Sequence, residues 1–128
     1  MLADITFIGS TIKSLQVNNK VTKLPAVSSV NINVGVSDPS ITSITDEEVT
    51  YLHGVLQLQI DLNITNDTEE VLSEISLLLE GAYRIDSGVD RNEFNDLVRF
   101  NGLANLYTVA RSEIITFTSH IYSEGKVV

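Results

Sequence analysis

The strongest constraint in this sequence is a two-residue alternation in the stretch YLHGVLQLQIDLNI, residues 51–64. Apolar residues Leu52, Leu56, Leu58, Ile60, Leu62 and Ile64 alternate there with His53, Gln57, Gln59, Asp61 and Asn63. Successive side chains of a β-strand point to opposite faces, so a period of two is the signature of a strand. The stretch therefore predicts a strand with one apolar face and one polar face.

Three other segments also have strand patterns, and they cover residues 3–17, 30–36 and 74–85. The alternation of the first slips near Gly9, which suggests a β-bulge. The second, VNINVGV, places Val30, Ile32, Val34 and Val36 on one face. Turn-forming residues in SDPSITSITDEE, residues 37–48, break the pattern, and TNDTEE at 65–70 is typical of a hairpin turn.

The period changes after residue 86. Asp90 is a candidate cap for a short helix, with Glu93 three residues later as in a capping box. Asn101 and Gly102 predict an interruption, and Asn101 a cap for a second, longer helix that ends near Ser123, before Gly125. Steps of four and three join the apolar residues of this long helix, which are Leu103, Tyr107, Ala110, Ile114, Phe117 and Ile121.

Strands followed by helices indicate an α+β fold. We expect one domain over residues 1–128, with a four-stranded antiparallel sheet followed by a short helix and one long helix packed on one face. The long helix must bury its apolar side, most simply on this sheet.

Composition excludes several classes of function. The 128 residues contain no cysteine, so disulfides and thiolate metal sites are ruled out. The chain contains 17 acidic and eight basic residues, and the resulting formal net charge of −9 argues against nucleic-acid binding. No run of about 18 apolar residues predicts a membrane span. The N-terminus lacks the pattern of a secretory signal, so we expect a cytoplasmic protein.

No pattern indicates catalysis. The two histidines, His53 and His120, are far apart and have no companion ligands, so we expect no metal site. Asp86, Asp90 and Glu93 resemble a calcium loop only in composition, and a loop followed by a helix cap explains them better. Neither a phosphate-binding glycine loop nor a nucleophile elbow is present. We therefore expect no catalytic residues, no cofactor and no enzyme activity.

From Leu79 onward the chain resembles the SecB-type protein-export chaperones. The fourth strand of that family ends in a glycine, an aromatic residue and an isoleucine, and a short helix, a break and a long helix follow. Gly81, Tyr83 and Ile85 stand in the strand positions, and Leu106, Tyr107, Arg111 and Ile114 fit the order of the long helix. The specific likeness covers about 35 residues, whereas the general layout covers nearly the whole chain.

This resemblance implies an ATP-independent chaperone that binds unfolded polypeptides, with preprotein export as one context and a dimer of dimers as the assembly. By position, Val30, Ile32 and Val34 match the second-strand residues of the family's client groove, and Tyr107 matches its helix aromatic. The family's crossover, second helix and metal-binding tail would follow the long helix, where this sequence ends at Val128.

A translocation ATPase is the family's partner in export. Ser76 and Val17 stand near positions where the family carries the acidic residues that contact this ATPase. Holding of non-native chains therefore agrees better with this sequence than coupling to export does.

Other interpretations remain open. The chain could instead be a SecB-like adaptor or structural protein for one specific partner, related to toxin–antitoxin systems or phage. Val30, Ile32, Val34 and Tyr107 could be ordinary core, in which case Ile32→Ser would cost several kcal/mol, against about 0.5 kcal/mol in an open groove. Residues 4–17 carry few charges for an edge strand, so we expect them to lie at a sheet edge and to pair with a second copy.

Overall fold

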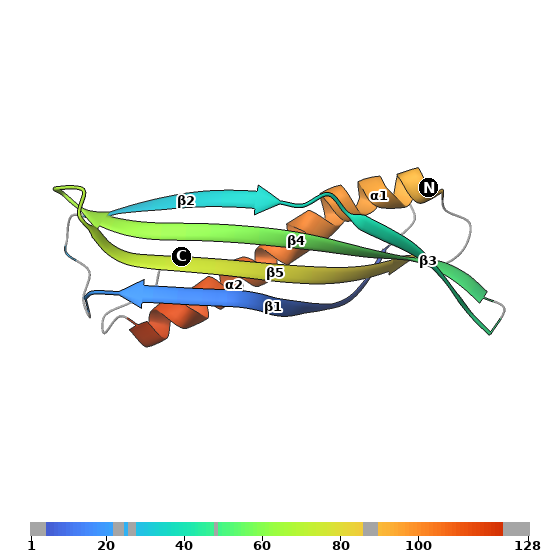
Figure 1. Ribbon diagram of the computed structural model, residues 1–128, viewed down its shortest axis with the longest axis horizontal. Coiled ribbons are helices and arrows are strands. Elements are labelled where there is room, and N and C mark those ends of the chain that lie inside the picture. The colour runs from blue at the N-terminus through green and yellow to red at the C-terminus, as the bar shows by residue number, and fades with distance from the viewer. Residues whose placement is uncertain (1–4, 22–24, 26–27, 48, 86–89, 122–128) are drawn as a thin grey trace.

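The computed structural model describes residues 5–21, 25, 28–47, 49–85 and 90–121. It contains one antiparallel sheet with a continuous helical segment across one face (Figure 1). The strands are β1 (Thr6–Asn19), β2 (Ser28–Val36), β3 (Ser40–Asp46), β4 (Val49–Asn66) and β5 (Val71–Ile85). The helical part consists of α1 (Arg91–Leu97), the π-helical turn η1 (Val98–Gly102) and α2 (Leu103–Ile121). The predicted α+β class is confirmed.

The sheet has five strands, where four were predicted. Its order is β1-β5-β4-β2, and β3 also pairs with β4. Strand β4 is 18 residues long, and β2 pairs only with residues 58–66 of it. Strand β3 pairs with residues 49–55, so β2 and β3 follow one another along the same edge of β4. The Ser, Thr and Ile residues of β3 were interpreted as part of a turn, but a long neighbouring strand supplies backbone partners for them.

One face of the two central strands forms the core. Alternate residues of β4 and β5 are buried there, and the predicted apolar faces of both strands are confirmed. Helix α2 lies over β4 and β5 and reaches β1, and α1 and η1 pack on β4 (Figure 1). The buried residues of the helical part are Phe94, Leu97, Val98, Leu106, Ala110 and Ile114.

The long helix is turned relative to the predicted apolar line. Leu106 is fully buried, whereas Tyr107, which the sequence pattern placed in that line, is exposed. Thr118 is also buried, and its hydroxyl donates to the carbonyl of Ile114 one turn earlier. A step of four residues through 106, 110, 114 and 118 therefore describes the buried side of α2.

The predicted break at residues 101–102 is wrong. The backbone continues from α1 into α2 through η1, so Asn101 does not cap a helix. The Tyr83 hydroxyl donates a 2.7 Å hydrogen bond to the Gly102 carbonyl in this turn. A Cβ atom on residue 102 would lie 3.1 Å from the Tyr83 ring. Glycine at position 102 therefore lets the turn approach the sheet. Burial of the Tyr83 hydroxyl in this contact raises the pKa of Tyr83 to about 12.

Other local predictions had mixed outcomes. Asp90 is the first residue before α1, but its side chain makes no capping hydrogen bond. The bulge near Gly9 is confirmed by a register shift between Phe7 and Gly9. The predicted turn at 65–70 is confirmed, with the Asn66 side chain accepting from the backbone N–H groups of Thr68 and Glu70. Asp86, the loop before α1, and the residues after Ile121 lie outside the described residues.

Candidate functional site

Strand β2 carries a row of apolar side chains that nothing in the described chain covers. Val30, Ile32 and Val34 are 44%, 51% and 48% exposed, and Val36 is similarly exposed. Each pairs in register with a buried residue of β4, so the four side chains lie on the face of the sheet that carries the helices. The sequence interpretation that placed Val30, Ile32 and Val34 in an ordinary core is therefore wrong for the single chain.

The position of α2 explains this exposure. One helix is about 10 Å across with its side chains, and neighbouring strands lie about 4.8 Å apart. A single helix therefore covers about two strands of a sheet. Here α2 crosses β4 and β5 obliquely and reaches β1, whereas β2 remains open (Figure 1).

Tyr107 lies on the flank of α2 that faces β2. The other flank of α2 faces β1, because Asn105 and Asn101 line a small hollow together with Phe7 of β1. Two residues correspond to about 200° around an α-helix, so Tyr107 and Asn105 point to opposite sides. Tyr107 is 46% exposed.

An ion pair joins the turn η1 to the end of the β2 edge. The Arg99 guanidinium in η1 lies 3.0 Å from the Asp38 carboxylate, two residues after β2 ends. Both side chains are well exposed, so this pair contributes little to stability. It does show that η1 lies next to the junction between β2 and β3.

Sequence reasoning did not assign Val36 to the site, and it did not single out Phe100. Phe100 follows Arg99 in η1 and is 69% exposed, the largest value among the exposed large apolar residues of the described chain. Val98 and Gly102, two residues to either side of it, are buried, so Phe100 points away from the sheet and not toward β2. Val36 continues the alternation of Val30, Ile32 and Val34.

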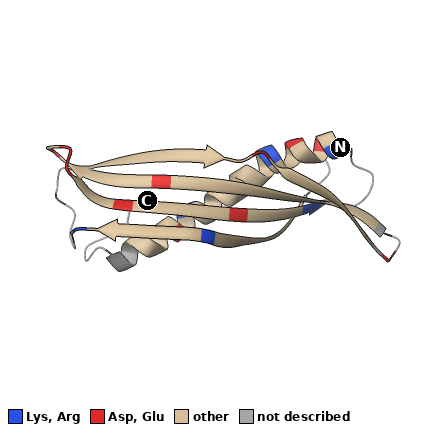
Figure 2. Cartoon of the chain, in the orientation of Figure 1, with Lys and Arg blue, Asp and Glu red and all other residues tan. Residues whose placement is uncertain are grey.

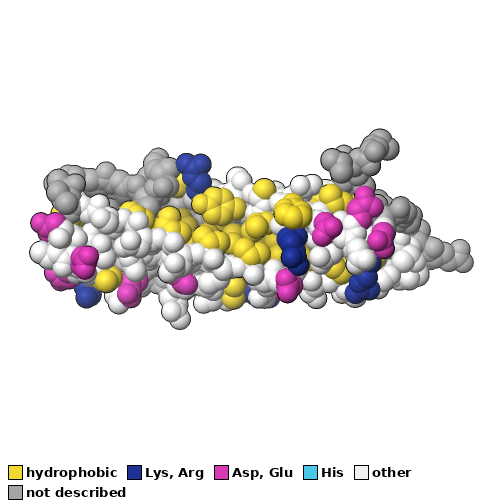
Figure 3. Space-filling model, turned by 90° about the horizontal axis from the view of Figure 1, so that it is seen from above, with side chains coloured by type: hydrophobic (Ala, Val, Ile, Leu, Met, Phe, Trp, Pro, Cys, Tyr) yellow, Lys and Arg dark blue, Asp and Glu magenta, His cyan; other side chains and the backbone are white. Residues whose placement is uncertain are grey.

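Five residues define an apolar channel: Val30, Ile32, Val34 and Val36 on β2, and Tyr107 on the facing flank of α2. Figure 3, which views the molecule from the side of β2, shows apolar side chains gathered along the middle of that side. Strand β2 itself has no charged residue (Figure 2). An open apolar surface of this kind favours the binding of ligands that bury apolar area on it.

A second apolar row lies on β1, beyond the other flank of α2. Phe7, Ile12, Leu15 and Val17 pair with buried β5 residues and are exposed by 37–43%. The prediction that this strand lies at a sheet edge is confirmed, since β1 ends the strand order. Pairing of β1 with a second copy stays a prediction.

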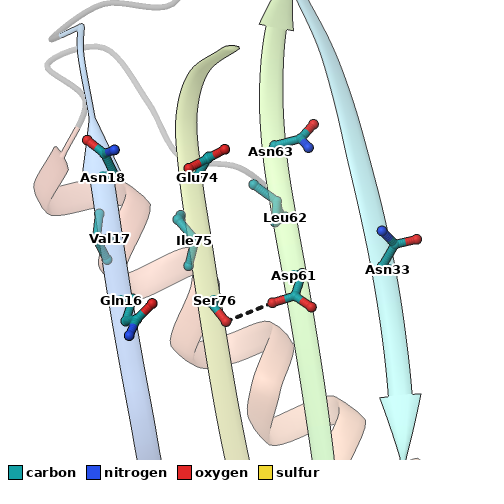
Figure 4. Close-up of a pocket in the computed structure, with 10 residues that line it drawn as sticks. All are labelled: Gln16, Val17, Asn18, Asn33, Asp61, Leu62, Asn63, Glu74, Ile75 and Ser76. Carbon is teal, nitrogen blue, oxygen red and sulfur yellow. Dashed lines mark hydrogen bonds between the residues drawn. The ribbon is translucent and has the colours of Figure 1, made fainter.

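The opposite face of the sheet is polar, and no helix of the described residues lies over it. A hollow of about 400 Å³ lies there, lined by ten residues of β1, β5, β4 and β2 (Figure 4). The Ser76 hydroxyl donates to the Asp61 carboxylate at 2.7 Å, and the Gln59 amide donates to both. These side chains satisfy one another. The neighbouring Val17 points to the helix-covered face, because it pairs with buried Ile75.

The remaining candidate groups do not form a site within the described residues. His53 is half-buried on the polar face, and the side chain of His120 lies outside the described part. In the described ranges, no three His, Asp or Glu side chains are grouped as a metal site would need. No helix in the described part is both long and apolar enough to cross a membrane.

No protein-family model and no curated protein matches this chain. Among solved structures, the chain is similar to the Mycobacterium tuberculosis Rv1957 SecB-like chaperone, which was determined in complex with a ChAD peptide from the Rv1956 HigA1 antitoxin. The TM-score is 0.63 at 12% sequence identity, over 91% of this chain and 83% of that one. The chain therefore has a SecB-like fold, as the resemblance in its sequence predicted.

Proposed function

We propose that this protein is an ATP-independent chaperone that binds non-native polypeptide segments in the apolar channel. The observation that carries the proposal is the channel itself: five large apolar side chains, 43–51% exposed, lie along the open edge of the sheet and the facing flank of α2. A continuous apolar patch of this kind is typical of a binding surface. The SecB-like fold supports the same function, since the similar structure is named a chaperone.

Apolar burial would supply the affinity. A fully buried aliphatic side chain contributes about 1.5–3 kcal/mol, and roughly half of this remains available on each β2 residue of the channel. A client that covered the channel would therefore combine several contacts of about 1 kcal/mol. Such binding tolerates many sequences, because the hydrophobic effect is non-directional.

The test is suppression of aggregation of a reduced, unfolded client at stoichiometric amounts of this protein. Ile32→Ser should weaken the suppression, because it removes an apolar side chain from the middle of the channel. Asn33→Ser is the matched control, since Asn33 is the next residue of the same strand and points to the polar face. A folded protein that does not suppress aggregation, or that loses suppression equally in both variants, would contradict the proposal.

A second candidate function is that of an adaptor for one specific partner. The similar Rv1957 structure holds a peptide from an antitoxin, which is a defined partner. Co-purification separates the two functions. Many unfolded proteins on the wild-type chain, and few on Ile32→Ser, favour the chaperone, whereas one stoichiometric partner favours the adaptor.

A further inference from the structure

We propose that the free edge of β2 takes up an extended polypeptide segment as an additional antiparallel strand, and that the segments it selects have alternating apolar residues. This inference rests on the proposed function and specifies how the client is held. The proposed function uses only the side chains of the apolar channel, whereas this inference adds hydrogen bonds to the backbone of β2.

The edge of β2 is open and unguarded. Strand β2 ends the strand order, so no described strand pairs with its outer side. Its nine residues contain no charged residue and no proline, and its pairing with β4 has no register shift. Natural edge strands usually carry charged residues, proline or bulges, because these features prevent pairing with other chains.

The other edge of the sheet is different. Strand β1 has two register shifts, one between Phe7 and Gly9 and one between Ile12 and Ser14. Its Lys13 lies in the second shift, 3.7 Å from the Glu80 carboxylate. Bulges and a lysine at an edge both disfavour the addition of a strand. An extended client should therefore add to β2 and not to β1.

The hydrogen-bond phase of β2 can be assigned from its end. The Ser37 N–H donates a 3.0 Å bond to the Gln57 carbonyl of β4, and this pair continues the register of Gly35 with Gln59. In an antiparallel pair, residues that bond across alternate with residues whose backbone groups point away. Asn31, Asn33 and Gly35 therefore bond to β4. Val30, Ile32, Val34 and Val36 direct their N–H and C=O groups to the open edge.

The same four residues thus supply the apolar side chains of the channel and the free backbone groups. In an antiparallel added strand, the residue opposite Ile32 would exchange two hydrogen bonds with it and place its side chain on the same face. Every second client residue would then lie over the channel. The intervening residues would lie over the polar face, beside Asn31 and Asn33.

The occupant is an extended polypeptide because the backbone groups of a strand match the spacing of those on β2, as in other cases of strand addition. An alternating segment fits this edge better than a continuous apolar segment of the same composition, since half of the latter would contact the amide side chains of the polar face.

The first experiment is amide hydrogen exchange by NMR with a nine-residue peptide that alternates threonine and valine between terminal lysines. Saturating peptide should slow exchange at Val30, Ile32, Val34 and Val36 by about tenfold or more and leave Asn31 and Asn33 unchanged. Uniform or absent protection along β2, with the peptide bound, would overturn strand addition. Protection of the four amides without peptide, rising with protein concentration, would assign the edge to a second copy and would also overturn it.

The second experiment uses two N-methylated forms of this peptide and measures their affinities by calorimetry. Methylation of the valine amides should weaken binding about tenfold or more, because these amides would face β2, and methylation of the threonine amides should not. Equal affinities of both forms, or the reverse order, would overturn the inference. Retained suppression of client aggregation in that case would leave the chaperone function standing, whereas failure of suppression would remove both.

Discussion

Two facing residues of the sheet provide the clearest test of which apolar positions are covered. Ile32 of β2 pairs in register with Leu62 of β4 on the same face. Their side chains differ in exposure, 51% for Ile32 and 3% for Leu62. Their local sequence patterns are the same, so only the tertiary structure distinguishes them. Replacing each by serine measures that difference.

The expected costs follow from the exposure. Full burial of an aliphatic side chain contributes about 1.5–3 kcal/mol, so Ile32→Ser should lower the free energy of unfolding by about 1 kcal/mol. Leu62→Ser leaves a cavity and buries a hydroxyl, so it should cost about 3–5 kcal/mol. In a chain of this length, 1 kcal/mol corresponds to a change of about 3–5 °C in the melting temperature.

Urea denaturation followed by circular dichroism at two protein concentrations measures both costs. A loss of several kcal/mol for Ile32→Ser, close to that of Leu62→Ser, would refute the assignment of β2 as an open strand. A loss that grows with protein concentration would show that a second copy covers Ile32. Asn33→Ser, on the polar face of the same strand, controls for the β-propensity of serine.

Four further predictions concern the core and the assembly. Tyr83→Phe removes the hydrogen bond to the Gly102 carbonyl and should cost about 1–2 kcal/mol in thermal or urea unfolding. The pKa of Tyr83 is raised to about 12 in the folded protein, so its contribution is complete below pH 10 and should be lost as pH rises from 10 to 12; Tyr83→Phe should lack this part of the loss. A Cβ atom on Gly54 would lie 3.0–3.1 Å from side chains of Val98, Ile41 and Phe94, so Gly54→Ala should cost about 1–3 kcal/mol, and unchanged stability would contradict this packing. Light scattering at micromolar concentration tests the expected pairing of β1 with a second copy, which the register shifts and Lys13 of this edge oppose, and a strict monomer would contradict the pairing.

The sequence by itself determined four of the five strands and their faces. The alternation in β4 and β5 correctly identified which side chains turn inward, because a strand has no other way to separate apolar from polar residues. The same alternation located β2, and the change of period located the helices. The family resemblance correctly predicted a SecB-like fold.

Local pattern could not determine the phase of the helical segment. Leu106 and Tyr107 are both large and apolar enough to face the sheet, and the π-helical turn η1 before them decides which one does. That turn depends on Gly102 meeting Tyr83, a contact between residues 19 apart. The strand character of Ser40–Asp46 likewise depends on the unpaired half of β4, which a local reading as a turn does not include.

Only the tertiary structure decided which apolar faces are open. Val30, Ile32 and Val34 alternate as Ile60, Leu62 and Ile64 do, yet the first three are exposed and the last three are buried. The physical reason is width: one helix covers about two strands, and α2, which lies over β4 and β5 and reaches β1, leaves β2 uncovered. The candidate site therefore arises where the apolar pattern of the sheet extends beyond the helix that covers it.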